Sequence, residues 1–114
     1  MSQKAILRKK LLSIPLPQTN VTSVEVREIR FEPGQETGRH LHPCAVMGHI
    51  VEGAAVMQVE GETPQQLATG AAFYEPAGTV IARFDNASVT KPMKFVAYYL
   101  LNGKQELIEM LPVA

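Results

Sequence analysis

Two of the three histidines in this chain of 114 residues, His40 and His42, are separated by a single residue. Side chains two positions apart on a β-strand project to the same side, so both imidazoles could bind one metal ion through neutral ring nitrogens. Imidazole ligands suit divalent transition metals such as zinc, nickel, copper or iron better than manganese or magnesium. Because known sites commonly use three or four protein ligands, we expect this pair to hold a metal weakly unless solvent or a bound ligand completes the shell.

The same two histidines allow a second interpretation, in which the protein is free of metal. They would then be the polar contacts in a cavity that is empty or that holds a small organic ligand. The residue types alone leave both alternatives open.

Three nearby residues are weaker candidates for ligands. His49 follows on the same stretch of chain, but strict alternation puts it on the opposite face, as a packing or interface histidine, unless a one-residue bulge reverses it. Cys44 extends the pattern to His-x-His-x-Cys, although Pro43 bends the chain between them and a lone cysteine is more often a small buried hydrophobe. Glu75 is the one acid beside Pro76, and we expect it to face solvent.

Short strands must position these residues, because turn residues recur at fairly regular intervals and no stretch carries a long amphipathic helix. The apolar alternation predicts strands at 24–31, 39–42, 46–51, 54–59, 71–75, 80–84, 93–101 and 105–111. The first of these has one slip in its period of two, which is typical of a strand with a bulge.

About eight to ten short strands cannot remain one flat sheet, because both edges would be exposed and only one face buried. The sequence therefore predicts an all-β fold, an antiparallel barrel of the double-stranded β-helix or jelly-roll type, in a single domain. We place an N-terminal arm or first strand at residues 1–23 and the barrel at residues 24–114. In such a barrel the inward-facing residues decide the function.

Composition excludes several classes of partner. The 11 basic residues balance the 11 acidic ones, so no long-range field draws the protein to nucleic acid or to an anionic lipid surface. No apolar run approaches the ~18 residues of a membrane span. Ser13 and Pro15 interrupt the N-terminal apolar run too early for an export signal. Together with the single cysteine, these features predict a cytoplasmic protein.

Two segments resemble the paired motifs of the cupin family. Residues 34–53 read GQETGRHLHPCAVMGHIVEG and are similar to the first motif, a glycine followed after five residues by His-x-His and then by a glutamate and a closing glycine. Residues 70–86 read GAAFYEPAGTVIARFDN and are similar to the second motif, a glycine followed by Pro-x-Gly, a histidine and an asparagine. The matching positions are Gly34, His40, His42, Gly53, Gly70, Pro76, Gly78 and Asn86. The resemblance covers residues 24–111 and implies a small single-domain cupin of the conserved-barrel type.

The resemblance also implies a place for a metal, although two of its four ligand positions are changed in this chain. In the family, the two histidines and the glutamate of the first motif and the histidine of the second typically hold a divalent ion. The glutamate position falls on Val46, or on Met47 if the loop is one residue longer, and the second-motif histidine falls on Ile81. Such a pocket suits a small, partly hydrophobic molecule. The predicted pocket residues are Val46, Met47, Met57, Phe73, Ile81, Phe84 and Tyr98.

Three functions from different classes remain. We favour a divergent cupin of unassigned activity that binds a small molecule, together with a weakly held metal at His40 and His42. The alternatives are a metal-dependent enzyme resembling the cupin dioxygenases or isomerases, and a non-catalytic dimeric scaffold. No catalytic residue is assigned, because no nucleophile motif or phosphate-binding loop is found. Since small cupins commonly dimerise through N-terminal strands, we expect a homodimer, and the apolar residues that could form it are Ile6, Leu7, Leu11, Leu12 and Ile14.

Overall fold

The expected all-β fold is confirmed by the computed structural model, which describes residues 4–113 and contains no helix in that range. Residues 1–3 and residue 114, the outer ends of the two predicted segments, lie outside the described residues. The strands are β1 (Ser23–Phe31), β2 (His40–Leu41), β3 (Ala45–Glu52), β4 (Ala55–Val59), β5 (Gln65–Leu67), β6 (Ala72–Glu75), β7 (Ile81–Asn86), β8 (Met93–Leu101) and β9 (Glu109–Met110). The last predicted strand, 105–111, is thus reduced to two residues.

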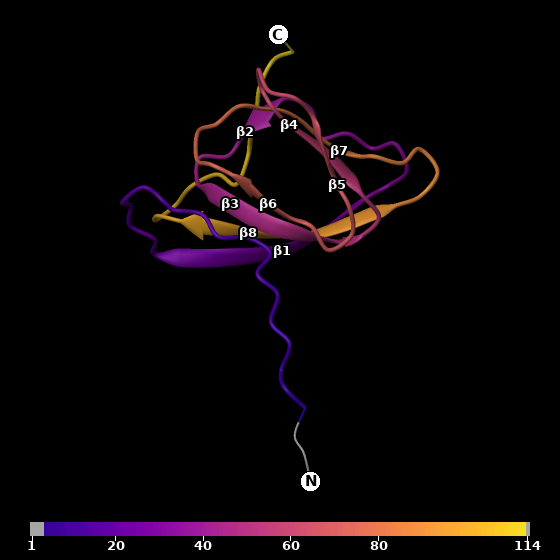
Figure 1. Ribbon diagram of the computed structural model, residues 1–114. Coiled ribbons are helices and arrows are strands. Elements are labelled where there is room, and N and C mark those ends of the chain that lie inside the picture. The colour runs from indigo at the N-terminus through magenta and orange to yellow at the C-terminus, as the bar shows by residue number, and fades with distance from the viewer. Residues whose placement is uncertain (1–3, 114) are drawn as a thin grey trace.

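The strands form two antiparallel sheets that face each other and enclose the interior of a barrel (Figure 1). One sheet has the order β1-β8-β3-β6 and the other has the order β5-β4-β7-β2-β9. β2, which carries His40, belongs to the second of these sheets, whereas β6, which carries Glu75, belongs to the first, so residues of these two strands come together only because the barrel closes.

The predicted bulge in the first strand is wrong. β1 pairs with β8 in one uninterrupted register from Ser23 opposite Leu101 to Phe31 opposite Met93. The slip in the apolar pattern arises because β1 carries apolar residues on both faces: Val26 is exposed, whereas Phe31 packs against the core. Register shifts occur instead near the ends of β3 and β4, between Ile50 and Glu52 and between Gln58 and Val59.

The core is formed by the alternate residues that point inward from both sheets. In β8 every second residue from Met93 to Leu101 is buried, and the residues between them are only partly buried. Three phenylalanines make the centre of this core: the ring centroids of Phe73 and Phe95 each lie 4.9 Å from that of Phe84. Rings at this separation add stabilisation beyond the area that they bury.

Gly48 in β3 lets the Phe73 ring lie close against the sheet. A Cβ at this position would stand 2.1 Å from the carbonyl oxygen of Val96 and 2.7 Å from the ring of Phe73. Neither distance is compatible with a side chain, so the aromatic cluster depends on a residue without a Cβ.

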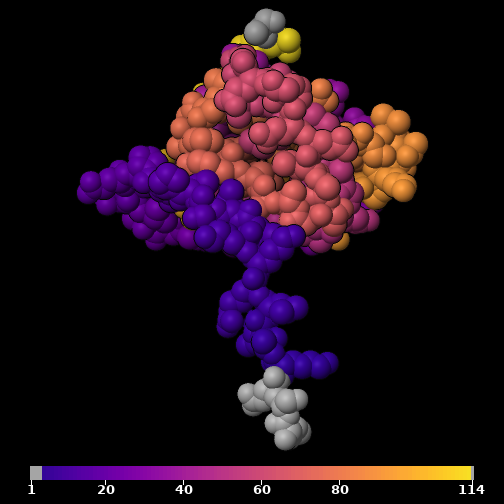
Figure 2. Space-filling view, viewed as in Figure 1, coloured from indigo at the N-terminus to yellow at the C-terminus, as the bar shows by residue number. Residues whose placement is uncertain are grey.

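Residues 4–22, before β1, contain no strand. This N-terminal segment runs along the outer side of the β1-β8-β3-β6 sheet, and its first residues project away from the body of the molecule (Figure 2). Residues 4–113 include no helix with the length and apolar character that crossing a membrane requires. The expected cytoplasmic location and the absence of a nucleic-acid partner remain predictions.

Candidate metal centre

His40 and His42 lie at one end of the barrel interior and are 1% and 5% exposed. His40 belongs to β2, where its direct partner across the sheet is Ile81 of β7. His42 follows β2 immediately, and the two ring centroids are 5.1 Å apart. The two imidazoles therefore project to the same side of the chain, as their spacing predicts.

Backbone carbonyl groups fix the protonation of both imidazoles. The Nδ1 atom of His40 lies 2.7 Å from the carbonyl oxygen of Gly38, and that of His42 lies 2.6 Å from the carbonyl oxygen of Leu107. Because a carbonyl oxygen can only accept, each Nδ1 must carry the proton and donate it. In the neutral imidazoles both Nε2 atoms consequently present a lone pair, which is the arrangement that metal-ligating histidines need.

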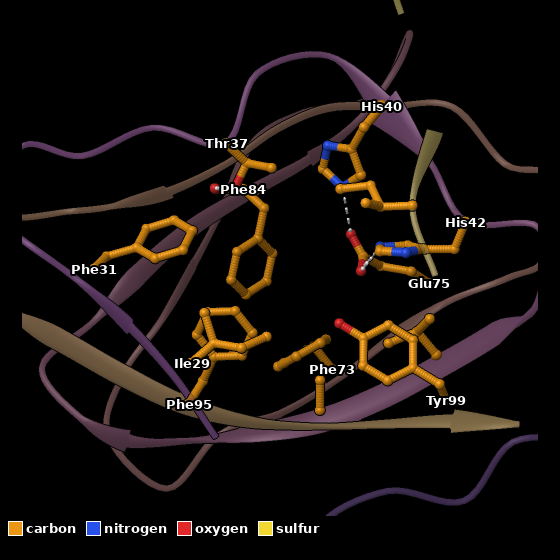
Figure 3. Close-up of a pocket in the computed structure, with 13 residues that line it drawn as sticks. Ile29, Phe31, Thr37, His40, His42, Phe73, Glu75, Phe84, Phe95 and Tyr99 are labelled. Carbon is orange, nitrogen blue, oxygen red and sulfur yellow. Dashed lines mark hydrogen bonds and ion pairs between the residues drawn. The ribbon is translucent and has the colours of Figure 1, made fainter. Parts of the chain in front are cut away.

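Glu75 meets these two Nε2 atoms, which corrects the expectation that it faces solvent. Its side chain is buried, with only 3% of the residue exposed. Its Oε2 lies 2.9 Å from Nε2 of His42 and its Oε1 lies 3.5 Å from Nε2 of His40 (Figure 3). The longer contact is too long for a good hydrogen bond, and Oε1 has no hydrogen-bond partner among the described residues.

The register between β3 and β6 explains why this carboxylate points inward. Glu75 stands directly opposite Val46, the position where the first cupin motif has its glutamate. Direct partners in an antiparallel pair project to the same face, and Val46 is buried in the core. The acid is thus supplied to the same end of the barrel from the neighbouring strand.

His40, His42 and Glu75 form a group in which one potential ligand atom from each lies within 4.8 Å of the others. Burial alone would raise the pKa of Glu75, but the contacts with His40 and His42 outweigh it and lower the pKa. For His42, burial would lower the pKa, and the hydrogen bond and negative charge of Glu75 together with the Leu107 carbonyl raise it. The arrangement of the three side chains therefore favours a positive charge among them, as a proton or as a metal ion.

A cavity of about 220 Å³ adjoins this group. Its walls are mostly apolar, and the polar groups other than Thr37 lie at the end formed by the two histidines, Glu75 and Tyr99 (Figure 3). The lining residues that keep some exposure include Ile29 and Phe31 of β1 and Ile108, which is 39% exposed. The cavity therefore opens between β1 and the segment before β9. The full lining is Ile29, Phe31, Thr37, His40, His42, Val46, Phe73, Glu75, Phe84, Phe95, Ala97, Tyr99 and Ile108.

Of the predicted pocket residues, Val46, Phe73 and Phe84 line this cavity. Met47 and Tyr98 lie on the outer side of the sheet instead, so Tyr99 rather than Tyr98 reaches the interior. The sequence could not decide the phase, because the stretch containing Tyr98 is apolar in nearly every position.

The remaining candidates lie away from the cavity lining. Met57 and Ile81 are buried in the barrel but line other parts of the interior. His49 lies on the outer side, stacked on Tyr98 with ring centroids 6.1 Å apart. Cys44 is a buried free thiol that contacts a different hollow, near the N-terminal segment. Neither His49 nor Cys44 belongs to the group formed by the two histidines and Glu75.

The comparison with known families agrees with the fold and with the paired motifs. Residues 27–99 match the Cupin domain family. This chain belongs to the cupin family. The cupin is also similar to the beta-alanine degradation protein BauB of Pseudomonas aeruginosa, with 35% identity over 68 residues that cover 58% of this chain and 72% of BauB. The resemblance stated from the sequence is therefore confirmed.

Solved structures show the same fold at low sequence identity. A cupin-like protein from Thermotoga maritima superposes with a TM-score of 0.66 and 22% identity, over 77% of this cupin and 64% of that chain. The DMSP lyase DddQ from Ruegeria pomeroyi gives a TM-score of 0.66 and 18% identity, over 77% of this cupin and 43% of the lyase. This cupin thus matches less than half the length of the lyase, and the likeness concerns the barrel alone.

Proposed function

We propose that this cupin is a metal-dependent enzyme of small-molecule metabolism, in which His40, His42 and Glu75 hold one divalent transition metal ion at the closed end of the cavity. The observation that carries the proposal is the buried carboxylate of Glu75 facing two imidazole nitrogens whose opposite nitrogens donate to backbone carbonyls.

The electrostatics of this arrangement favour a cation. With both imidazoles neutral, two lone pairs would face a carboxylate in a site that excludes solvent, which is repulsive at low dielectric. One oxygen of Glu75 also remains buried without a hydrogen-bond donor. A buried polar atom of this kind costs on the order of 1–3 kcal/mol, and a metal ion would remove that cost.

The donor set fits zinc or ferrous iron. Two imidazoles and one carboxylate are a ligand set of catalytic zinc sites and of non-haem iron sites, which leave coordination positions open. When bound, such an ion supplies a Lewis acid that polarises an oxygen of the substrate. The carboxylate also compensates part of the ionic charge, which the two histidines alone could not do.

The protein residues around the ion have separate tasks. The carbonyls of Gly38 and Leu107 orient the imidazoles, and the apolar wall formed by Phe73, Phe84 and Phe95 excludes water and packs against the substrate. The similarity to a protein named for beta-alanine degradation supports a small metabolite as the substrate.

The test is metal analysis of the purified protein after chelation and reloading with zinc or ferrous iron. We expect about one ion per chain in the wild type and in His49→Ala, a control that removes a histidine outside the site. His42→Ala and Glu75→Gln should lose most of the metal while keeping the β-rich circular dichroism spectrum. Equal metal content in all four proteins, or none in the wild type, would refute the proposal.

We also propose that the protein is a homodimer in which the N-terminal segment and the outer face of the β1-β8-β3-β6 sheet form the interface. Leu7 is 93% exposed, and Val24 and Val26 on the outer face of β1 are 54% and 56% exposed. Exposed apolar residues gathered on one side support a contact between copies. Sedimentation equilibrium should give a dimer that Leu7→Glu combined with Val26→Glu weakens, whereas Val89→Glu, in a distant exposed loop, leaves it intact. A monomeric wild type would disprove this.

A further inference from the structure

The inner face of β1 carries a charged pair next to the cavity. Glu25 stands opposite Tyr99 and Arg27 stands opposite Ala97 in the register of β1 with β8. Because direct partners share a face, both charged side chains project to the cavity side of the sheet, in line with Ile29. Tyr99, Ala97 and Ile29 all line the cavity.

Arg27 is the only lysine or arginine that the strands of this sheet place on the cavity side. The other basic residues of β1 and β8, Arg30 and Lys94, are partners of each other and lie on the outer face. Ala97, the direct partner of Arg27 across the sheet, is buried and lines the cavity. The cavity side of this sheet thus carries one cationic group, whose side chain is 56% exposed.

Arg27 and Tyr99 both keep hydrogen-bond donors that have no partner within residues 4–113. Arg27 contacts Glu25 through Nε, and its two terminal nitrogens donate no hydrogen bond within residues 4–113. The hydroxyl of Tyr99 makes no hydrogen bond in the same range, and it points into the cavity (Figure 3). Burial and the charge of Glu75 raise the pKa of Tyr99, and the charge of Arg27 opposes them.

We propose that Arg27 and Tyr99 form a carboxylate-binding subsite and that the substrate is a small organic acid with an apolar body. This inference rests on the proposed metal-dependent function. The carboxylate would bind the terminal nitrogens of Arg27 and the hydroxyl of Tyr99, on the β1 side of the metal centre, and the apolar body of the molecule would lie in the cavity.

The dimensions of the sheet agree with a substrate of this size. β1 and β6 are separated by three strand spacings, which is about 14 Å at about 4.8 Å each. If the side chains of Arg27 and Glu75 both extend inward, the span left between them would suit a small organic acid. The surface between them is apolar, since Val46, Phe95 and Ala97 line it. Charge-assisted hydrogen bonds to the guanidinium of Arg27 are well suited to recognise a carboxylate.

The experiment compares the binding of benzoate with that of benzamide, its uncharged analogue, to zinc-loaded protein by titration calorimetry. Benzoate should bind better than benzamide, and Arg27→Gln should weaken benzoate binding about tenfold while leaving benzamide unchanged. Tyr99→Phe should weaken benzoate by a smaller factor. Glu25→Gln, which removes the competing carboxylate, should strengthen it.

The control is Arg30→Gln, because Arg30 lies on the same strand and is paired with Glu32, but faces outward. Benzoate affinity should not change in this variant. If benzoate does not bind to the wild type, or if Arg27→Gln and Arg30→Gln have equal effects, the subsite is disproved.

Zinc content measured on the same samples separates the two proposals. Arg27→Gln should keep full zinc, so weaker benzoate binding with normal zinc identifies a defect of the subsite alone. If the wild type holds no zinc, the proposed metal function fails, and the dependence of benzoate binding on Arg27 in the metal-free protein still decides the subsite.

Discussion

Glu75 and Val46 are direct partners across the antiparallel pair of β6 and β3, and both side chains point into the barrel. Val46 occupies the position at which the first cupin motif has a glutamate, so the acid in this chain is displaced sideways by one strand. The Cβ atoms of such partners are only about 5 Å apart. A carboxylate can therefore reach the histidines from either strand.

Exchanging these two residues should move the carboxylate ligand from position 75 to position 46, where the cupin motif has its glutamate, and should leave the metal site able to form. We expect Glu75→Val alone to weaken zinc binding by more than the roughly 100-fold that loss of an outer-shell partner can cause. The double variant Val46→Glu with Glu75→Val should recover a measurable part of this affinity, as read by competition with a fluorescent chelator. If the double variant binds no better than Glu75→Val, the equivalence of the two positions is wrong.

The stability of the metal-free protein should depend on pH through His42 and Glu75. The contribution of His42, whose pKa is raised from 6.5, is complete below 6.5 and is lost as the pH rises through the raised value. The contribution of Glu75, whose pKa is lowered from 4.5, is present above 4.5 and is lost as the pH falls through the lowered value. The melting temperature of the chelated protein should thus be highest between pH 4.5 and pH 6.5.

Calorimetry of chelated protein should accordingly show an unfolding midpoint that falls as the pH rises above 6.5 and through the raised pKa of His42. Added zinc should remove most of this fall, because the ion then supplies the positive charge that the proton supplied. Glu75→Gln should flatten the slope in the metal-free protein. A slope that persists in this variant would show that other groups cause it.

Replacing Gly48 by alanine should destabilise the barrel more than its small size suggests. The new Cβ would meet the Val96 carbonyl and the Phe73 ring, and such overpacking costs about 3 kcal/mol or more when backbone must shift. Gly61→Ala is a useful comparison, because Gly61 has a φ of 85° but nothing within 4 Å of the added Cβ. That variant should lose only the ~1–2 kcal/mol of a left-handed conformation. Urea unfolding of both variants measures the difference.

Cys44 should behave as a packing residue and not as a ligand. It is 3% exposed, and burial raises the pKa of its thiol. Labelling by a disulfide reagent should be at least about 100-fold slower in the native protein than in denaturant, because reaction requires local opening. Cys44→Ser should keep the zinc content of the wild type. Rapid labelling of the native protein would contradict the buried position.

Glu75 shows how far the sequence could have led. Phe73, which the sequence predicts to be a pocket residue, lines the cavity, and a residue two positions later on the same strand must share its face. This alternation alone indicates that Glu75 points into the barrel. An acid next to a proline at a strand end is usually solvated, but at Glu75 the alternation of the strand outweighs that general preference.

By itself, the sequence determined the all-β class, the paired cupin motifs and the common direction of His40 and His42. These depend on turn residues and on a period of two, which are local properties of the chain. Only the tertiary structure decided that Glu75 completes the group and that the Leu107 carbonyl, 65 residues from His42, fixes its ring. Both depend on the strand register and on closure of the barrel, which arise from packing among distant residues and leave no mark in the local pattern.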